Sequence, residues 1–321
     1  MSIASYAGAS DTGRKRRRNE DSYVLAPPIF AVADGMGGAQ AGEIASRLAA
    51  AALEDTDPGA KSGAERVTSL IQEANRRVHE RAIADPTTSG MGTTMTVALV
   101  EGTTVTFGHV GDSRAYRFRD GAIEQITEDH SLVNELLKSG KLSPEEADTH
   151  PQRSVITRAV GTDPDVDVDS FTIEAEVGDV FLICSDGLTD MVDDEDIRSV
   201  LDKFHNDLDR ATKSLVSAAN RGGGEDNITV VAFEISEDGG ETARMPAVEE
   251  DTMESIPVPK VDTMVVPPEE VEHVFVEPGS PEAAAITKRE PITPAARVRL
   301  VLVMLVLLAV AAVLLVWGLV R

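Results

Sequence analysis

Acidic residues recur where short apolar runs of this sequence begin or end, often with glycine beside them. In Ile29-Phe-Ala-Val-Ala-Asp-Gly-Met-Gly-Gly38, an apolar run typical of a buried strand ends at Asp34. A lone carboxylate there would be costly unless something pairs with it, and the glycines would let the backbone approach a ligand closely. The other acidic residues at such boundaries are Glu20, Asp21, Asp112, Asp186 and Asp226.

The repetition of this pattern points to one shared site. A single aspartate at a strand edge is commonly a cap or a turn former, so no one of these positions is informative alone. Four or five of them, each at a predicted strand boundary, are expected to converge. Crowded carboxylates repel one another unless cations lie among them, and hard divalent ions such as Mg²⁺ or Mn²⁺ suit an all-oxygen site. The sequence therefore predicts a metal centre rather than unrelated aspartates.

The elements that would position these carboxylates alternate between strands and helices. Apolar spacing predicts helices at Ala39–Asp55, Glu65–Ala84 and Leu132–Lys138. The pair Asp120-Gly121 is a strong hairpin signal, and the short turns favour largely antiparallel sheets with helices outside, an α+β fold. Strands are expected at Ser22–Leu25, Ile29–Ala33, Thr93–Val100, Thr103–Val110, Ala115–Arg119, Ile123–Gln125, Asp167–Ile173, Val180–Cys184 and Ile228–Glu234.

Composition narrows the class of protein. A formal net charge of −25 over 321 residues argues against a nucleic-acid binder that neutralises phosphates. The one basic run is Arg14-Lys-Arg-Arg-Arg18. Cys184 is the only cysteine, so no intramolecular disulfide is possible and a reducing compartment is expected.

The chain is expected to consist of three segments. Residues 1–236 are the expected folded unit. Residues 237–299 form an acidic linker that holds most of the prolines and few large apolar residues, a composition typical of a disordered tether. Leu300–Val320 is uncharged and aliphatic, and at ~1.5 Å per residue its length of ~31 Å matches a bilayer core of ~30 Å. The basic residues before this run predict a single-pass cell-membrane protein with a cytoplasmic folded domain.

Six short motifs occur in this order along the chain: Arg16-x-x-Asn-Glu-Asp21, Asp34-Gly-Met-Gly-Gly38, Gly92-Thr-Thr94, Gly111-Asp-Ser-Arg114, Ser185-Asp-Gly-Leu-x-Asp190 and Gly224-Glu-Asp-Asn-Ile-Thr229. Together they resemble the motifs of the metal-dependent serine/threonine protein phosphatases, the PPM or type 2C family, in its bacterial form. The resemblance extends from about Tyr6 to Ile235 and implies a four-layer α/β/β/α sandwich of two mainly antiparallel sheets, with two Mg²⁺ or Mn²⁺ ions at one edge.

The resemblance also implies roles for individual metal ligands. Asp34 matches the carboxylate that bridges both ions, and the carbonyl oxygen of Gly35 would bind one of them. Asp186 and Asp226 match ligands of the other ion. Asp112 matches a residue that, together with the Asp186 counterpart, holds a third and weaker ion in bacterial members.

Three further residues complete the implied site. Glu20 and Asp21 match positions that reach the metals directly or through water. Arg16 matches the residue that binds the substrate phosphate, and a guanidinium suits this task because its planar fork holds two oxygens at once. The reaction implied is in-line attack on phosphorus by a metal-activated water, with no covalent enzyme intermediate.

One residue departs from the pattern of many eukaryotic members. They carry His after Asp-Gly, where it is thought to protonate the leaving alkoxide, and this chain carries Met36. Bacterial members commonly share this Met, so its presence is compatible with activity. A metal-bound water is the preferred general acid, and His109 and His150 are weaker alternatives.

Two further segments of the chain have recognisable patterns. Asp163–Asp169 superficially resembles a calcium loop, but its sixth position is Val168 rather than Gly, and alternating Asp and Val favours a strand with one solvated face. His130–Gly161 corresponds to a mobile flap beside the active site of the family. This flap is either a substrate-selecting loop or an ordinary surface excursion.

The sequence thus predicts a membrane-tethered phosphatase acting on phosphoserine and phosphothreonine proteins. Its expected partners are serine/threonine kinases and their substrates, with the membrane contacted through Leu300–Val320 and no nucleic acid. The alternatives are a non-catalytic, phosphatase-like binder of phosphoproteins at the membrane and a hydrolase of small phosphoesters. Thr252 and Thr263, in a short near-repeat of the linker, are weak candidates for phosphorylation.

Overall fold

A computed structural model of the chain describes residues 2–37, 41–55, 61–147 and 150–237. The predicted linker from residue 238 onward and the apolar run Leu300–Val320 lie outside these residues. None of the helices formed by the described residues is long and apolar enough to cross a membrane. The description therefore concerns the predicted folded unit.

Two antiparallel sheets form the body of this unit. The first sheet has the order β1 (Ser2–Asp11), β11 (Ile228–Ser236), β10 (Val180–Cys184), β7 (Arg114–Arg119) and β8 (Ala122–Gln125). The second has the order β2 (Asp21–Ala26), β3 (Ile29–Met36), β5 (Met95–Glu101), β6 (Thr104–Val110) and β9 (Asp169–Glu174), with β4 (Gly92–Thr93) also paired to β3. The two-sheet α+β fold predicted from the sequence is confirmed.

Side chains that alternate along each strand divide the core into layers. In β3, Phe30 and Val32 face the other sheet, whereas Ile29 and Ala31 pack among residues of the helical layer. Phe30 stacks on Phe233 of β11 with ring centroids 4.4 Å apart and planes 10° from parallel. An apolar layer rich in phenylalanine therefore holds the two sheets face to face.

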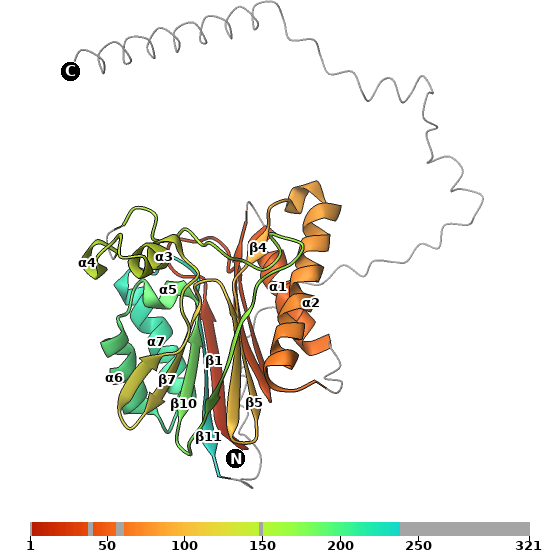
Figure 1. The fold of residues 1–321 in the computed structure, drawn as a ribbon. Helices are drawn as coiled ribbons and strands as arrows, with labels where there is room; N and C mark the ends of the chain where they lie inside the picture. Colours follow the sequence, from red (N-terminus) through yellow and green to blue (C-terminus); the bar gives the residue numbers. More distant parts are fainter. Residues whose placement is uncertain (1, 38–40, 56–60, 148–149, 238–321) are drawn as a thin grey trace, which may run out of the picture. The chain divides into compact units, whose positions relative to one another are not determined.

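Helices cover the outer face of each sheet (Figure 1). Residues of α1 (Ala41–Asp55) and α2 (Gly63–Ala84) pack on the second sheet, and residues of α6 (Asp194–Phe204) and α7 (Leu208–Gly222) pack on the first. The result is the four-layer sandwich. The short helices are α3 (Leu132–Lys138), α4 (Pro144–Ala147), α5 (Asp186–Thr189) and the 3₁₀ turn η1 (Pro86–Thr88).

β1, α6 and α7 are not among the elements predicted from the sequence. β1 consists mainly of small residues that remain half-buried, and it becomes a strand by pairing with β11 along its whole length. The two helices did carry a local signal, because the side chains of Asp193 and Asp207 accept hydrogen bonds from backbone N–H groups of the first turn.

The predicted strand at Asp167–Ile173 is wrong at its start. β9 begins at Asp169, and the preceding residues form a loop. Val166 of that loop is buried in the core beneath α2, and Gln72 of α2 donates a hydrogen bond to its carbonyl oxygen at 2.5 Å. The alternation of Asp and Val therefore reflects packing of a loop against a helix, not a longer strand.

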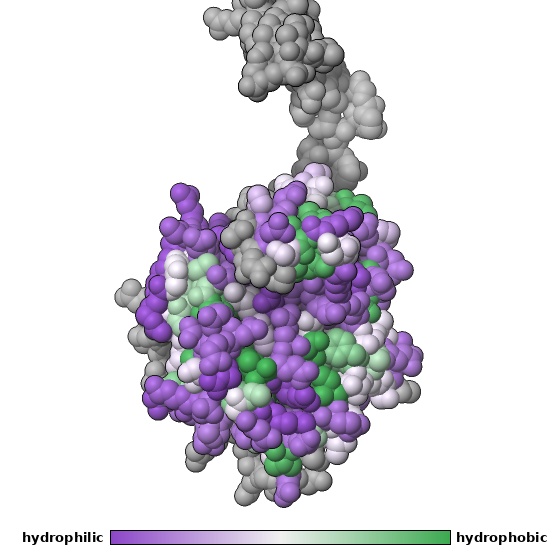
Figure 2. Space-filling model, turned by 60° about the vertical axis from the view of Figure 1, so that its left-hand side comes forward, coloured by the Kyte–Doolittle hydropathy of each residue, from purple (hydrophilic) through white to green (hydrophobic). Residues whose placement is uncertain are grey.

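The surface seen in Figure 2 is mostly hydrophilic, with apolar residues in small, separate groups. Among the described residues, the large apolar side chains that are exposed are Tyr23, Ile83, Val155 and Val177. They come from different elements and do not follow one another in sequence. Scattered apolar residues of this kind are ordinary for a protein surface.

Replacing Phe233 with alanine should lower the free energy of unfolding by about 3–5 kcal/mol, because the ring is fully buried between the sheets and its loss leaves a cavity. Urea denaturation of the full chain would measure this change. The control Val177→Ala, at a side chain that is 49% exposed, should stay within about 0.5 kcal/mol of the parent. A similar, small effect of both substitutions would contradict the described inter-sheet core.

Candidate metal centre

Asp21 and Asp34 of the second sheet lie directly opposite each other in the paired strands β2 and β3. Residues opposite in an antiparallel pair project to the same face, so the two carboxylates are neighbours. The Oδ2 atom of Asp21 accepts hydrogen bonds from the hydroxyls of Ser185 at 2.8 Å and Thr229 at 2.6 Å. Ser185 directly follows β10 and Thr229 lies in β11, so both come from the first sheet. Asp21 therefore joins the two sheets at the edge where the predicted site lies.

Asp186 and Asp226 reach the same edge from the first sheet. Asp186 follows β10 and opens α5, and Asp226 lies in the connection between α7 and β11. The two loops are so close that a Cβ atom on Gly187 would lie 2.1 Å from the carbonyl oxygen of Asn227 and 3.4 Å from the Cβ of Asp226. Glycine at position 187 thus brings the loops of Asp186 and Asp226 together.

The electrostatics of this edge show how strongly the carboxylates are crowded. Burial raises the pKa of Asp186 to about 8, with repulsion from Asp112 and Asp226 adding to the effect. Burial, together with the charges of Asp21 and Asp186, also holds the pKa of Asp34 well above its ordinary value. Burial raises the pKa of Asp21 to about 6. A cation placed among these carboxylates would offset both the cost of burying their charges and the repulsion between them.

Gly35 lies where three backbone segments meet. A Cβ atom there would lie 2.1 Å from the carbonyl oxygen of Gly42 and 2.6 Å from that of Glu20, and the N–H of Gly35 donates to Glu20 at 3.2 Å. Close backbone packing therefore requires glycine here, independently of the predicted contact between its carbonyl and a metal. Burial raises the pKa of the Glu20 carboxyl, which lies beside the start of α1 near Gly42.

Arg16 extends over this edge from the loop between β1 and β2. Its guanidinium donates to Oδ2 of Asp226 at 2.6 Å, while 52% of its side chain stays exposed. The structure thus places the predicted phosphate-binding group beside a predicted ligand, in an ion pair that remains open to solvent.

Asn227 is a residue whose role the sequence analysis missed. Its side-chain N–H groups donate to the carbonyl oxygens of Thr12 at 2.9 Å and Arg18 at 2.8 Å, and its Oδ1 accepts the N–H of Glu20 at 2.8 Å. This one amide therefore fixes the loop that carries Arg16. The only available signal was its place directly after Asp226.

Asp112 lies in the loop after β6 and is 9% exposed. Its neighbour Ser113 forms a hydroxyl pair with Thr94 at 2.8 Å, and the hydroxyl oxygen of Thr94 accepts the N–H of Asp34 at 3.0 Å. Burial raises the pKa of Asp112 to about 6, with repulsion from Asp129 adding to it. Thr94, from the motif that had no assigned role, links the backbone of Asp34 to the side chain of Ser113, the residue next to Asp112.

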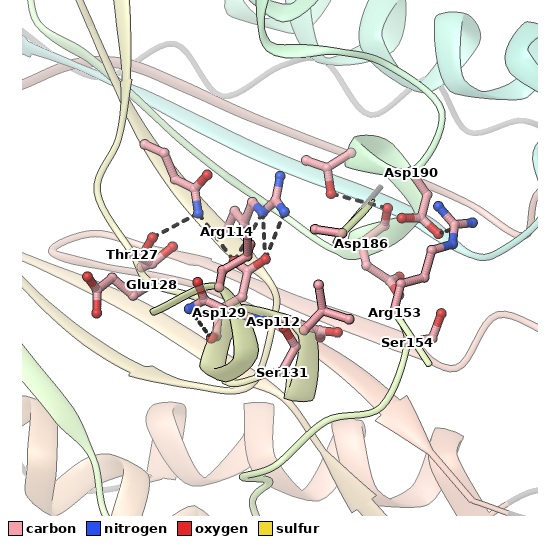
Figure 3. Close-up of a pocket in the computed structure, with 16 residues that line it drawn as sticks. Asp112, Arg114, Thr127, Glu128, Asp129, Ser131, Arg153, Ser154, Asp186 and Asp190 are labelled. Atoms are coloured by element: carbon pink, nitrogen blue, oxygen red, sulfur yellow. Dashed lines mark hydrogen bonds and ion pairs between the residues drawn. The ribbon is translucent and has the colours of Figure 1, made fainter. Parts of the chain in front are cut away.

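A pocket of about 610 Å³ opens beside Asp112 and Asp186 (Figure 3). Its far wall comes from α3 and neighbouring parts of the flap, residues 130–161. Arg153 of the flap lies 3.3 Å from Asp190, one turn after Asp186. The flap and the loops of Asp112 and Asp186 therefore share one concave surface.

The donor set fits hard divalent cations. No group of three or more His, Cys, Asp or Glu side chains among the described residues is already arranged to hold a metal ion. In the arrangement described, Asp226 pairs with Arg16, and one oxygen of Asp21 is taken by hydroxyls. The other oxygen, Oδ1 of Asp21, and Oδ1 of Asp186 are buried without a hydrogen-bond partner among the described residues. Buried, unpaired carboxylate oxygens are what a cation would satisfy, and the individual ligand roles stay predictions.

The candidates for the general acid differ in their surroundings. His109 is fully buried, with its ring nitrogens 2.9 Å from the Thr96 hydroxyl and 3.1 Å from the Glu128 carbonyl oxygen. Burial lowers the pKa of His109 to about 4. His150 lies in the flap, where its Nδ1 accepts the N–H of Gln152 at 3.2 Å. The contacts of His109 fit a packing role.

The buried carboxylates make a pH-dependent prediction. The folded-state pKa of Asp186, about 8, lies above its ordinary value of 3.8, so its contribution to stability is complete below the ordinary value and is lost as the pH rises through about 8. In EDTA at pH 9, Asp186→Asn should be more stable than the parent by on the order of 2 kcal/mol, with the difference vanishing near pH 4.

Urea denaturation of the full chain from pH 4 to pH 9 would measure this difference. Asp202→Asn, on the exposed side of α6, is the matched control and should follow the parent at every pH. Parallel curves for the parent and Asp186→Asn would contradict the described crowding.

Comparison with known proteins places this geometry in a family. The model of the family described as protein phosphatase 2C matches residues 15–219. The serine/threonine protein phosphatase PstP of Mycobacterium tuberculosis is 41% identical over 244 residues, which cover 75% of this chain and 47% of PstP. This chain thus spans about half the length of that relative. The serine/threonine phosphatase stp of Listeria monocytogenes is 39% identical over 236 residues, which cover 70% of this chain and 93% of the relative.

Solved structures give the same result. The crystal structure of the M. tuberculosis phosphatase PstP/Ppp superposes with a TM-score of 0.69 at 40% identity, covering 73% of this chain and all of that one. The PstP catalytic domain in complex with two manganese ions superposes with a TM-score of 0.67 at 38% identity, covering 73% of this chain and 99% of that one. The chain therefore belongs to the protein phosphatase 2C family, the PPM family of metal-dependent serine/threonine phosphatases.

Proposed function

We propose that this chain is a metal-dependent protein phosphatase that hydrolyses phosphoserine and phosphothreonine. The observation that carries the proposal is the convergence of Asp21, Asp34, Asp186 and Asp226 at one edge of the sandwich. Burial raises the pKa values of the first three, and Asp21 and Asp186 each keep a buried oxygen without a hydrogen-bond partner among the described residues. Such a cluster is stable in its ionised form only with cations among its members. Family membership supports the substrate class, because the relatives are named serine/threonine phosphatases.

The residues of this chain would divide the work. Asp34, Asp186 and Asp226, with the carbonyl of Gly35, would hold two Mg²⁺ or Mn²⁺ ions, and Glu20 and Asp21 would support them. Two divalent ions bound there supply Lewis acidity and lower the pKa of water towards roughly 7.

Arg16 would bind and orient the phosphate of the substrate. Its guanidinium is half exposed at the edge of the site and contacts a carboxylate oxygen of Asp226. A phosphate oxygen is an anionic acceptor of the same kind and could take the place of this carboxylate oxygen. Asn227 and Gly224 hold the Arg16 loop, since Gly224 accepts the N–H of Arg14 at 2.6 Å. The loop of Arg16 is therefore fixed, while its exposed guanidinium is accessible to a substrate phosphate.

Tethering to the membrane is part of the proposal and rests on the sequence. Leu300–Val320 is long and apolar enough to span a bilayer, and the basic residues before it favour a cytoplasmic domain. A tether would concentrate the domain near phosphoproteins at the inner membrane surface. Serine/threonine kinases and their targets are the proposed partners.

Asp112, with Asp186, would hold a third and weaker ion.

Phosphate release from a phosphothreonine peptide by the full chain tests the catalytic proposal. Release should require Mn²⁺, stop with EDTA, and fall by at least ~10³-fold in Asp34→Asn, because that substitution removes the carboxylate expected to bridge both ions. Asp202→Asn should behave as the parent.

Other outcomes of this assay would select the alternatives. Tight binding of the phosphopeptide without release in any metal would favour a non-catalytic binder. Release from a small phosphate ester, but not from the peptide, would favour a small-phosphoester hydrolase.

The membrane proposal predicts where the chain fractionates. The full chain should stay in the membrane pellet after an alkaline carbonate wash, and a chain ending at Arg299 should be in the supernatant. The length-matched variant Leu308→Lys with Ala312→Asp should also leave the pellet, because each charge at the centre of a span costs about 2.5–3.5 kcal/mol. Full-length protein in the supernatant would refute the tether.

A further inference from the structure

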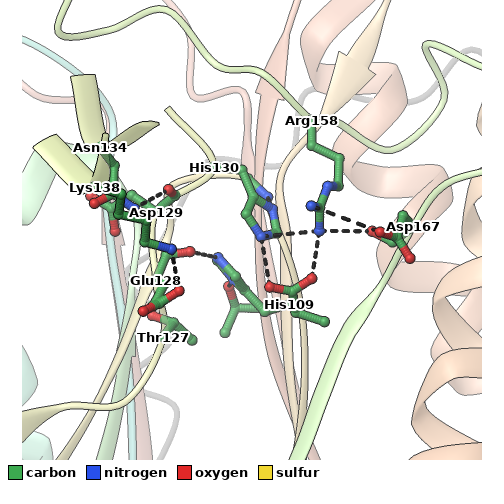
Figure 4. Close-up of polar contacts among 12 residues, drawn as sticks. His109, Thr127, Glu128, Asp129, His130, Asn134, Lys138, Arg158 and Asp167 are labelled. Carbon is green, nitrogen blue, oxygen red and sulfur yellow. Dashed lines mark hydrogen bonds and ion pairs between the residues drawn. The ribbon is translucent and has the colours of Figure 1, made fainter. Parts of the chain in front are cut away.

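His130, the first residue of the flap, connects three separate segments of the chain (Figure 4). Its ring is 8% exposed. Nδ1 accepts the N–H of Gly111 at 3.0 Å, and Nε2 lies 3.1 Å from Oδ2 of Asp169. Gly111 directly precedes Asp112, and Asp169 is the first residue of β9. One imidazole therefore bridges the loop of a predicted metal ligand and the edge of the second sheet.

The contacts determine the tautomer of this imidazole. A backbone N–H can only donate, so Nδ1 must be the unprotonated acceptor and Nε2 must carry the hydrogen. Nε2–H then donates to Asp169. Arg158 of the flap also donates to Asp169, at 2.5 Å, and its distance of 3.2 Å to Nε2 brings two donors together on one carboxylate. Asp169 thus holds the two ends of the flap at one point.

Backbone hydrogen bonds connect the same two ends. Ser131 pairs with Ile156 in an isolated bridge, and the N–H of Thr157 donates to the carbonyl oxygen of His130 at 2.8 Å. The N–H of His130 donates to the carbonyl oxygen of Gly111 at 2.8 Å. The flap therefore leaves the sandwich through a paired base, and His130 is the side chain that fixes this base to the loop of Asp112.

A second histidine packs against the imidazole ring of His130. His109 of β6 lies with its ring centroid 4.7 Å from that of His130, and its register partner in β9 is Asp169. A flat, buried ring therefore limits how His130 can tilt. The predicted strand histidine and the flap histidine form one packed unit, and neither is left with an unused polar atom.

We propose that His130 is a positioning residue for the phosphatase reaction, which fixes the base of the flap against the Asp112 loop and so sets the pocket for the protein part of the substrate. This inference rests on the proposed function. The flap wall of the pocket would contact residues flanking the phosphorylated side chain, which a small phosphate ester lacks. Misplacing such a wall by about 1 Å costs up to ~10²-fold in rate.

The test compares two substrates in the full chain with Mn²⁺: a phosphothreonine peptide and p-nitrophenyl phosphate. His130→Ala should lower kcat/KM for the peptide ~10- to 100-fold and for the ester less than ~3-fold. His130→Asn, whose Oδ1 can still accept the Gly111 N–H, should recover part of the loss. His205→Ala, at an exposed histidine at the end of α6, is the matched control and should change neither substrate.

Hydrogen exchange gives a readout that does not depend on turnover. In His130→Ala, the amides of Leu132 and Thr157 should exchange at least ~10-fold faster, while amides of β11 stay unchanged. Equal losses for both substrates, or unchanged exchange at the flap base, would overturn the proposal. If the parent hydrolyses neither substrate, the proposed function fails, and exchange at the flap base still decides whether His130 holds it.

Discussion

Repulsion among buried carboxylates is the constraint on which the rest of this structure depends. Burial raises the pKa of Asp34, and the charges of Asp21, opposite it in the same hairpin, and of Asp186, from the other sheet, raise it further. No apolar packing nearby can compensate such repulsion. A domain that keeps these groups ionised must bring cations to them, and the family relationship supplies that chemistry.

The scaffold meets this constraint with neutral hydrogen-bonding groups that hold the backbone. Thr94 accepts the N–H of Asp34, Ser185 and Thr229 donate to Asp21, and the amide of Asn227 fixes the loop before Glu20. None of these groups adds charge. They fix where the carboxylates stand while leaving oxygens of the cluster available, which is the arrangement expected of a preorganised site.

The apolar layer between the sheets explains how the two halves of the site stay in register. Phe30 lies four residues before Asp34 on β3, and Phe233 lies seven residues after Asp226, along β11. Their stacking connects the strand that carries one predicted ligand to the strand that follows the other predicted ligand. The flap is anchored separately, through His130 and Asp169, so its base and the metal edge meet at the Asp112 loop.

The sequence alone determined much of the local structure and the composition of the site. Continuous apolar runs define strands such as β3 and β5, and acidic residues at strand ends are visible without any structure. Clear periodicity also defines α1 and α2. These features are readable because each depends on spacing within a few residues.

Only the tertiary structure decided which distant groups meet. Ser2–Asp11 has no pattern of its own and becomes a strand through pairing with β11. Asn227, Thr94 and His130 have ordinary local contexts, and their roles arise from partners far away in the chain, such as Thr12, Asp34 and Asp169. A hydrogen bond of this kind leaves no periodic trace in the sequence, because its geometry exists only after the two sheets have packed.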